Sequence, residues 1–213
     1  MTNEGQIPMM RNMLNSAMRV GIPMSLFHCY ILTTDREVAD YETPQFNTLT
    51  LKKLKVIQMN MNLDKEILWV DNDIVFLQNC INDVRSKNGN FVMQDDLWSP
   101  CTGFFLARSD HFSDSVIKRS INWLSQQTDR HINDQHAFNE TYRQVPRINV
   151  TLLPRDEYPN GHVYFERGTT IARMIHCNSL STTAEKVERL KAHSLWDDSE
   201  AAYQIVNKYS LTL

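Results

Sequence analysis

The chain has 213 residues, of which 42% are hydrophobic and 22% are charged, a composition typical of a soluble globular protein and not of a disordered one. Its net charge of −3 excludes wholesale nucleic-acid binding, so a bound anion would need a local basic cluster or a metal ion. The longest apolar stretch, residues 20–32, is interrupted by Pro23 and His28 and is too short to cross a membrane. A polar beginning without a signal-peptide pattern and four scattered cysteines indicate a reducing compartment, so we expect a cytoplasmic protein.

The predicted elements alternate between helices and strands along the chain. Apolar residues at helical spacing predict helices over residues 10–18, 50–61 and about 110–127, followed by a shorter helix near Asp134 and a last helix that begins with the capping box of Thr182 and Glu185. Short apolar runs predict strands at residues 24–32, 67–70, 74–77, 91–93, 103–107 and 150–153. Residues 154–168 are expected to form a surface loop. This order predicts an α/β fold in one domain over residues 1–213, either alone or as one module of a longer polypeptide.

Two aspartates stand at the predicted end of a strand. Asp71 and Asp73 follow the apolar residues 67–70 and precede the apolar residues 74–77. Ligands bind at the carboxyl ends of strands in open α/β sheets, and alternate residues of an extended segment point the same way. We therefore expect both carboxylates to converge on one hard cation, which would bridge to diphosphate oxygens. The alternative is a solvated acidic turn, and the apolar residues on both sides favour the metal site.

A series of short motifs, in their order and spacing, resembles the nucleotide-diphospho-sugar transferases of the GT-A fold. The resemblance is to the family that includes plant cell-wall xylosyltransferases and virus-encoded glycosyltransferases. The motifs lie at residues 2–5, 53, 71–73, 102–105, 133–139, 158–161, 175–178 and 186–190. The resemblance implies a single Rossmann-like domain, with a mixed and mostly parallel sheet flanked by helices. It would place the protein in a host cell's cytoplasm if the chain is viral.

On the nucleotide side, the resemblance implies that Asp71, Asp73 and His176 hold Mn²⁺ or Mg²⁺ against the donor's diphosphate. An imidazole beside two carboxylates suits Mn²⁺ better than Mg²⁺. Without the resemblance, His176 would be interpreted as a hydrogen-bonded core residue. The remaining residues of this side are Asn72 near the ribose, Lys53 and Lys186 at the diphosphate or orienting the carboxylates, and Asn3 and Gly5 in the nucleotide-side loop. Either lysine could equally be a surface helix lysine, and Thr182 stands where many relatives carry a glycine.

On the sugar side, the resemblance implies that Asp134 binds a sugar hydroxyl and that Gln135 lies near the anomeric carbon. An aspartate that opens a helix can also be only an N-cap. One of Asp95 and Asp96 is expected to meet the donor sugar or the acceptor, and the other to be solvated. Gly103 of the Thr-Gly motif is grouped with the donor-binding residues.

The resulting hypothesis is a metal-dependent glycosyltransferase. It would move a sugar from UDP-glucose, UDP-rhamnose or UDP-xylose to a hydroxyl of a glycan or glycoprotein acceptor, with retention of configuration. One alternative is a haloacid-dehalogenase-type phosphatase, because residues 71–75 also fit its motif, with Asp71 as nucleophile and Asp73 as general acid. Another alternative is a binding module without catalytic activity.

Overall fold

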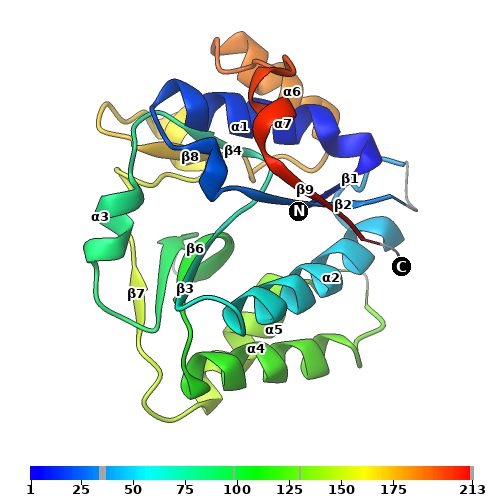
Figure 1. The fold of residues 1–213 in the computed structure, drawn as a ribbon, viewed down its shortest axis with the longest axis vertical. Coiled ribbons are helices and arrows are strands. Elements are labelled where there is room, and N and C mark those ends of the chain that lie inside the picture. The colour runs from blue at the N-terminus through cyan, green and yellow to red at the C-terminus, as the bar shows by residue number, and fades with distance from the viewer. Residues whose placement is uncertain (34–36, 98, 130, 212–213) are drawn as a thin grey trace. The chain divides into compact units, whose positions relative to one another are not determined.

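The computed structural model describes residues 1–33, 37–97, 99–129 and 131–211, and the chain divides into two compact units (Figure 1). The first unit comprises Met1–Tyr41, Asp71–Ile81 and Asp156–Leu213, and the second comprises Glu42–Val70 and Asn82–Arg155. Each unit is therefore built from segments that are far apart in the sequence. The two units are described in turn.

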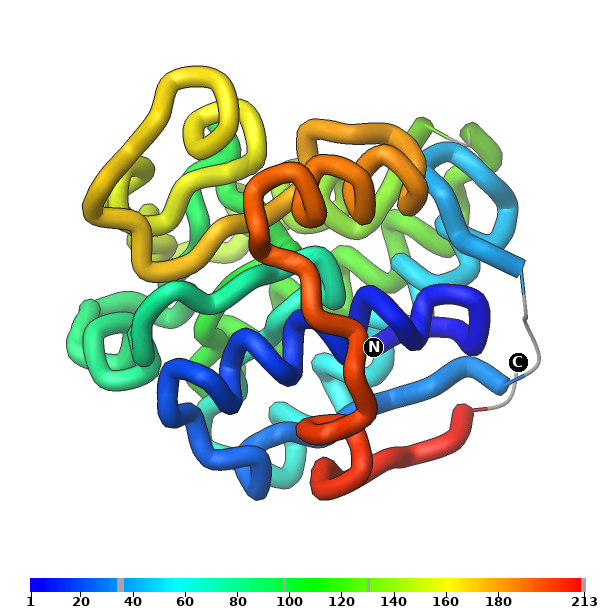
Figure 2. The backbone as a smooth tube through the Cα atoms, turned by 90° about the horizontal axis from the view of Figure 1, so that it is seen from above, coloured from blue at the N-terminus to red at the C-terminus, as the bar shows by residue number. Residues whose placement is uncertain are grey.

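The first unit holds two groups of strands. Its parallel sheet has the order β1-β2-β9, formed by Thr2–Asn3, His28–Leu32 and Asn207–Leu211. Figure 2 shows β9, in red, running alongside the blue β2. The second group is an antiparallel pair, β4 (Ile74–Phe76) with β8 (Met174–His176), in which Ile74 is directly opposite His176. This pairing brings the segment after residue 70 beside a segment a hundred residues later in the chain.

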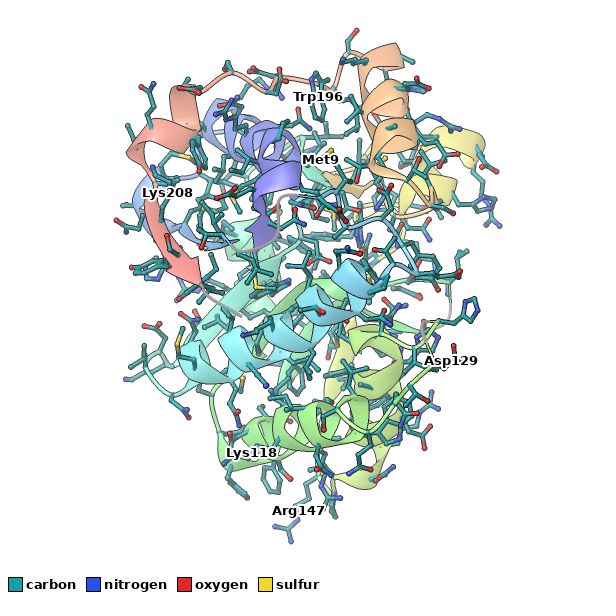
Figure 3. The ribbon with its side chains drawn as sticks, turned by 90° about the vertical axis from the view of Figure 1, so that its right-hand side faces the viewer. Met9, Lys118, Asp129, Arg147, Trp196 and Lys208 are labelled. Carbon is teal, nitrogen blue, oxygen red and sulfur yellow. The ribbon has the colours of Figure 1, made fainter. Side chains whose placement is uncertain are left out.

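Helices pack against these strands and bury an apolar cluster. The helices of the first unit are α1 (Ile7–Arg19), α6 (Thr183–Ala192) and α7 (Ala201–Ile205), with short 3₁₀ turns at Glu4–Gln6 and Met24–Leu26 and a π-helical turn at Val163–Arg167. Met9 of α1, Val75 of β4 and Leu190 of α6 are almost fully buried together, and Trp196 packs against them. Met9 and Trp196 are labelled in Figure 3. The apolar residues that are shared between α1, β4 and α6 hold the strand pair β4–β8 in place.

The second unit contains a mixed sheet with helices packed against it. The sheet has the order β3-β6-β5-β7, and β6 is antiparallel to both of its neighbours, while β7 is parallel to β5. The strands are β3 (Glu66–Val70), β5 (Phe91–Asp95), β6 (Pro100–Arg108) and β7 (Val150–Leu152), and the helices are α2 (Pro44–Met61), α4 (His111–Leu124) and α5 (Asp134–Thr141), with a 3₁₀ turn at Tyr142–Gln144. The helices α2, α4 and α5 contact one another, and α2 and α5 also contact β3 and β6 respectively (Figure 1). A short helix, α3 (Ile81–Ser86), follows β4 in the chain.

The alternation of helices and strands confirms the predicted α/β class, with several local differences. The run 24–32 is not one strand, because residues 24–26 form a 3₁₀ turn in which Leu26 is 63% exposed and only residues 28–32 extend into β2. Strand β3 is less buried than predicted, since Trp69 is its only buried residue. The helix α6 is followed by α7 and β9, whereas the sequence indicated no element after it.

The predicted surface loop at 154–168 is wrong over its middle part. Tyr158 and Asn160 are buried, and the backbone of Asn160 forms a parallel bridge with His176. The N–H of His176 donates to the carbonyl of Pro159 at 3.1 Å. A Cβ atom on Gly161 would lie only 3.3 Å from Oγ of Ser179, so the glycine here serves close packing and not a solvated turn. The segment lies against β8 almost as a third strand.

None of the described helices is both long enough and apolar enough to cross a membrane. All four cysteines are buried, and none of them forms a disulfide. This state agrees with the expectation of ordinary buried thiols.

Candidate functional site

Two aspartates and a histidine form a cluster in the first unit. Ligand atoms of Asp71, Asp73 and His176 all lie within 4.8 Å of one another. Nε2 of His176 lies 3.2 Å from Oδ1 of Asp73, and both of these side chains are less than a tenth exposed. Asp71 is half-buried. The three residues that the sequence predicts as metal ligands are therefore brought together.

The local backbone explains why these side chains converge. Residues 71–73 form a turn that closes when the N–H of Ile74 donates to the carbonyl of Asp71 at 3.3 Å. The backbone of Asp73 is held again by Cys177, whose N–H donates to its carbonyl at 3.0 Å. Together with the pairing of Ile74 and His176, these bonds place the side chains of Asp73 and His176 at one end of the β4–β8 pair. The predicted convergence is correct, but its reason is wrong, because a turn and not an extended segment brings the aspartates together.

Lys186 completes the charges around Asp73. Its Nζ lies 2.8 Å from Oδ2 of Asp73. Burial opposes ionisation of Asp73, but Lys186 and then His176 outweigh it and hold the pKa of Asp73 well below its usual range. Burial likewise disfavours the ammonium of Lys186, and the carboxylate of Asp73 outweighs this effect and raises the pKa of Lys186. Both groups are thus charged at neutral pH.

The first turn of α6 positions Lys186. Thr182 is the N-cap, and its hydroxyl accepts from the N–H of Glu185 while the Glu185 carboxylate accepts from the N–H of Thr182, as the predicted capping box requires. Asp40 adds a second cap, because its Oδ1 accepts from the N–H of Thr183 at 2.7 Å. Thr182 at the position of the relatives' glycine therefore serves to begin the helix that carries Lys186.

The predicted nucleotide-side residues have structural partners. The amide of Asn3, at the end of β1, donates to the carbonyl of Glu37 at 2.6 Å and accepts from the N–H of Gln6 at 3.2 Å. Gly5 lies in the 3₁₀ turn that follows. Asn72 donates from Nδ2 to Oγ1 of Thr2 at 3.1 Å, which ties the turn of Asp71 and Asp73 to β1. These bonds order the backbone around the cluster.

In the second unit, Lys53 of α2 forms an ion pair with Asp134 at the start of α5. Nζ of Lys53 lies 2.9 Å from Oδ2 of Asp134, and the two side chains are 7% and 6% exposed. The ammonium also lies 5.6 Å from the centre of the Trp69 ring. Asp134 is not the N-cap of α5, because Asn133 is. The alternative role of Asp134 as a simple capping residue is therefore not what the structure shows.

The remaining predicted residues of the second unit are also paired. Nε2 of Gln135 donates to Oδ2 of Asp96 at 3.2 Å, and Arg155 forms an ion pair with Asp95 at 2.7 Å. Gly103 lies in β6, where its N–H donates to the thiol sulfur of Cys101. Neither Asp95 nor Asp96 is simply solvated, so the expectation that one of them would be is not met.

The donor set of the cluster in the first unit fits a divalent cation. Two carboxylates and one imidazole offer oxygen and nitrogen ligands, which Mn²⁺ accepts. Cys177 lies next to His176, but burial and then the charge of Asp73 raise the pKa of its thiol to about 12. The thiol is therefore protonated while no cation is bound.

A model of the nucleotide-diphospho-sugar transferases matches residues 13–190 of the chain. The chain belongs to this family. A nucleotide-diphospho-sugar transferase moves a sugar from a nucleotide-sugar donor to an acceptor, so the chain is a glycosyltransferase. This assignment favours the transferase over the phosphatase that the motif at residues 71–75 also fits. No curated protein sequence gives a significant match.

Solved structures share the fold of this nucleotide-diphospho-sugar transferase. A glycosyltransferase involved in the glycosylation of the major capsid of PBCV-1 has a TM-score of 0.61 at 11% identity, over 89% of this chain and 97% of that one. The galactosyltransferase LgtC, in complex with donor and acceptor sugar analogues, has a TM-score of 0.62 at 10% identity, over 92% and 95%. GlyE of Streptococcus pneumoniae has a TM-score of 0.57 at 12% identity, over 95% and 60%. The GT-A fold predicted for the transferase is thus confirmed.

Three residues that support the predicted site residues of one unit or the other were not identified from the sequence. Asp40 caps α6, Trp69 lies beside Lys53, and Arg155 pairs with Asp95. A tryptophan in the apolar run before Asp71 is a weak signal of its own, since it equally indicates core packing. Asp40 and Arg155 lie in segments without regular structure, and no sequence pattern marks their partners.

Proposed function

We propose that this transferase moves a sugar from a UDP-sugar to a hydroxyl of a glycan or glycoprotein and retains the anomeric configuration. The proposal depends above all on the cluster of Asp71, Asp73 and His176 in a member of this family. These side chains would hold Mn²⁺, or Mg²⁺, against the donor's diphosphate. The four buried cysteines, which form no disulfide, support a reducing compartment such as the cytoplasm.

Each predicted site residue of the first unit has a proposed role in binding the donor. A bound cation supplies neutralisation of the charge that develops on the leaving diphosphate. Lys186 adds a second positive charge and can turn its ammonium from Asp73 to a phosphate oxygen, since its side chain is 21% exposed. Asn72 would lie near the ribose, and Asn3 and Gly5 would shape the nucleotide-side loop through their backbone.

For the second unit, the resemblance supports contacts with the sugar. Asp134 would accept a hydrogen bond from a sugar hydroxyl, and Gln135 would lie near the anomeric carbon, held by its bond to Asp96. The configuration is retained if the acceptor enters on the same face of the sugar as the leaving diphosphate. A β-phosphate oxygen would then take the proton of the acceptor hydroxyl, so that no separate carboxylate base is required. Asp95 and Gly103 would shape this part of the donor site through the backbone, as Asp95 is paired with Arg155.

Calorimetric titration of UDP tests the proposal directly. We expect UDP to bind the wild-type protein in Mn²⁺ and not in EDTA. The double variant Asp71→Asn, Asp73→Asn should lose on the order of 100-fold or more in affinity, because two of the three ligands are gone. The matched control is Asp64→Asn, which changes an exposed aspartate and should bind as the wild type does.

Two outcomes would contradict the proposal. UDP binding that is equal in Mn²⁺ and EDTA would reject the metal site, and no binding in either condition would reject UDP as the nucleotide. Thermal unfolding of each variant in EDTA separates a lost ligand from a lost fold. Hydrolysis of UDP-glucose, UDP-rhamnose and UDP-xylose then identifies the donor, and an inverted anomer in the product by NMR would reject retention.

A further inference from the structure

The sequence leaves open whether Lys53 binds the diphosphate or orients a carboxylate. The structure distinguishes these two roles. A lysine that is paired with a buried carboxylate can bind a diphosphate only by leaving that partner, which is strongly unfavourable because it leaves a buried charge unpaired. The side chain of Lys53 is 7% exposed, and its Nζ lies 2.9 Å from a carboxylate oxygen of Asp134 that is buried to the same degree. Its neighbour Lys55, two residues along α2, is exposed. The buried lysine is therefore the one committed to another side chain.

The surroundings of the pair favour a rigid contact. A buried charge is strongly unfavourable unless an opposite charge meets it, so the two side chains depend on each other. The Trp69 ring lies 5.6 Å from the Lys53 ammonium and covers it on one side. Water is thereby kept from the pair, and its attraction is stronger than it would be at the surface. Lys53 and Trp69 belong to α2 and β3, which contact each other.

The start of α5 leaves the Asp134 carboxylate available for this contact. Asn133 caps the helix, and its Oδ1 accepts from the backbone N–H groups of Gln135 and His136 at 3.0 and 3.3 Å. Asp134 is thus relieved of capping, and its side chain turns to α2. The ammonium of Lys53 sets where the Asp134 oxygens lie.

We propose that Lys53 is a positioning residue for Asp134 and does not bind the diphosphate. The ion pair holds the Asp134 carboxylate in one rotamer, so that one of its oxygens meets a hydroxyl of the donor sugar in a constant position. The inference rests on the proposed function, because it takes Asp134 as a sugar ligand. Under this proposal, Lys53 is needed for correct placement of the sugar and not for binding of UDP.

The test compares Lys53→Met and Lys53→Arg with the exposed control Lys55→Met. For each variant, UDP affinity is measured in Mn²⁺ by calorimetry, and kcat and KM are measured for hydrolysis of the UDP-sugar that the wild type cleaves. We expect Lys53→Met to bind UDP within twofold of the wild type and to lose roughly 100-fold in kcat, as a displaced ligand of the reacting sugar should cause. Lys53→Arg keeps the charge and should recover part of kcat, while Lys55→Met should change neither quantity.

Removal of Asp134 gives an independent check. If Lys53 acts through Asp134, the double variant Lys53→Met, Asp134→Asn should be no slower than Asp134→Asn alone. Independent, multiplying losses of kcat would overturn the inference. If Lys53→Met does not fold, the same comparison is made with Lys53→Arg, whose guanidinium places the charge differently.

The remaining outcomes separate this inference from the proposed function. A loss of UDP affinity of about tenfold or more in Lys53→Met or Lys53→Arg, as expected for a lost charged contact to phosphate, would overturn the positioning role and leave the proposed function intact. A wild-type protein that binds no UDP in Mn²⁺ would overturn the proposed function, and the inference with it.

Discussion

Each unit of the molecule places a lysine against a buried aspartate, but the surroundings of the two pairs differ. Asp73 meets Lys186 together with His176, and Asp71 lies within reach of the same point. Asp134 meets Lys53 beneath an indole ring. The first arrangement offers several ligand atoms to one position, whereas the second holds one carboxylate. The comparison teaches that the neighbours of an ion pair, and not the pair itself, indicate what the pair is for.

The largest expected difference between the pairs is in stability. Lys53→Met leaves a buried carboxylate without a counter-charge and should lower the free energy of unfolding by about 3 kcal/mol. Lys186→Met should cost about 1 kcal/mol, because His176 remains beside Asp73 and the lysine is already 21% exposed. Urea unfolding in EDTA measures both values. Equal losses for the two variants would show that the pairs are energetically alike and would contradict the comparison.

Acid titration sharpens the comparison for Asp73. Its pKa is lower in the folded protein than in the unfolded chain, because Lys186 and His176 outweigh the effect of burial. Its contribution to stability is therefore complete above the unfolded pKa of about 4 and is lost as the pH falls through the lower folded pKa. We expect unfolding free energies of the wild type to fall more steeply below about pH 4 than those of Asp73→Asn. Urea unfolding in EDTA measures these free energies, and an equal dependence on pH below about pH 4 in the two proteins would contradict this assignment.

The smallest expected effects concern the helix caps that support both pairs. Asn133 begins α5 just before Asp134, and Thr182 begins α6 one turn before Lys186, each in a capping box. Asn133→Ala and Thr182→Ala should each lower the free energy of unfolding by about 1 kcal/mol. Chemical unfolding with Thr48→Ala as the control measures the effect, since Thr48 is half-buried inside α2 and caps no helix. No loss in either variant would show that the caps are not needed.

The sequence could predict the elements whose patterns are local. The capping box at Thr182, the strands on both sides of Asp71 and Asp73, and the meeting of both aspartates with His176 all follow from residue order or from the family's motifs. The cluster was predicted for a partly wrong reason, since the aspartates lie in a turn. The apolar residues before and after them correctly indicated that this acidic segment is not simply solvated.

What could not be predicted depends on contacts between distant segments. Nothing near Lys53 in the sequence indicates that its partner is Asp134, because the packing of α2 against α5 creates that contact. The burial of Tyr158 and Asn160 likewise depends on the backbone of β8, which lies beyond the glycine and proline residues that suggested a loop. Leu26 differs in the opposite direction, because it was predicted to lie in a buried strand and is exposed in the structure.

The pairing of β2 with β9 has a consequence for synthesis on the ribosome. His28 lies opposite Asn207, so β2 emerges long before the strand that will cover one of its sides. Every segment of the second unit is complete once residue 155 has been made, whereas the first unit still lacks its last segment. The second unit can therefore fold first. Until β9 is made, one edge of β2 in the first unit is unpaired and can bind chaperones or pair with strands of other chains.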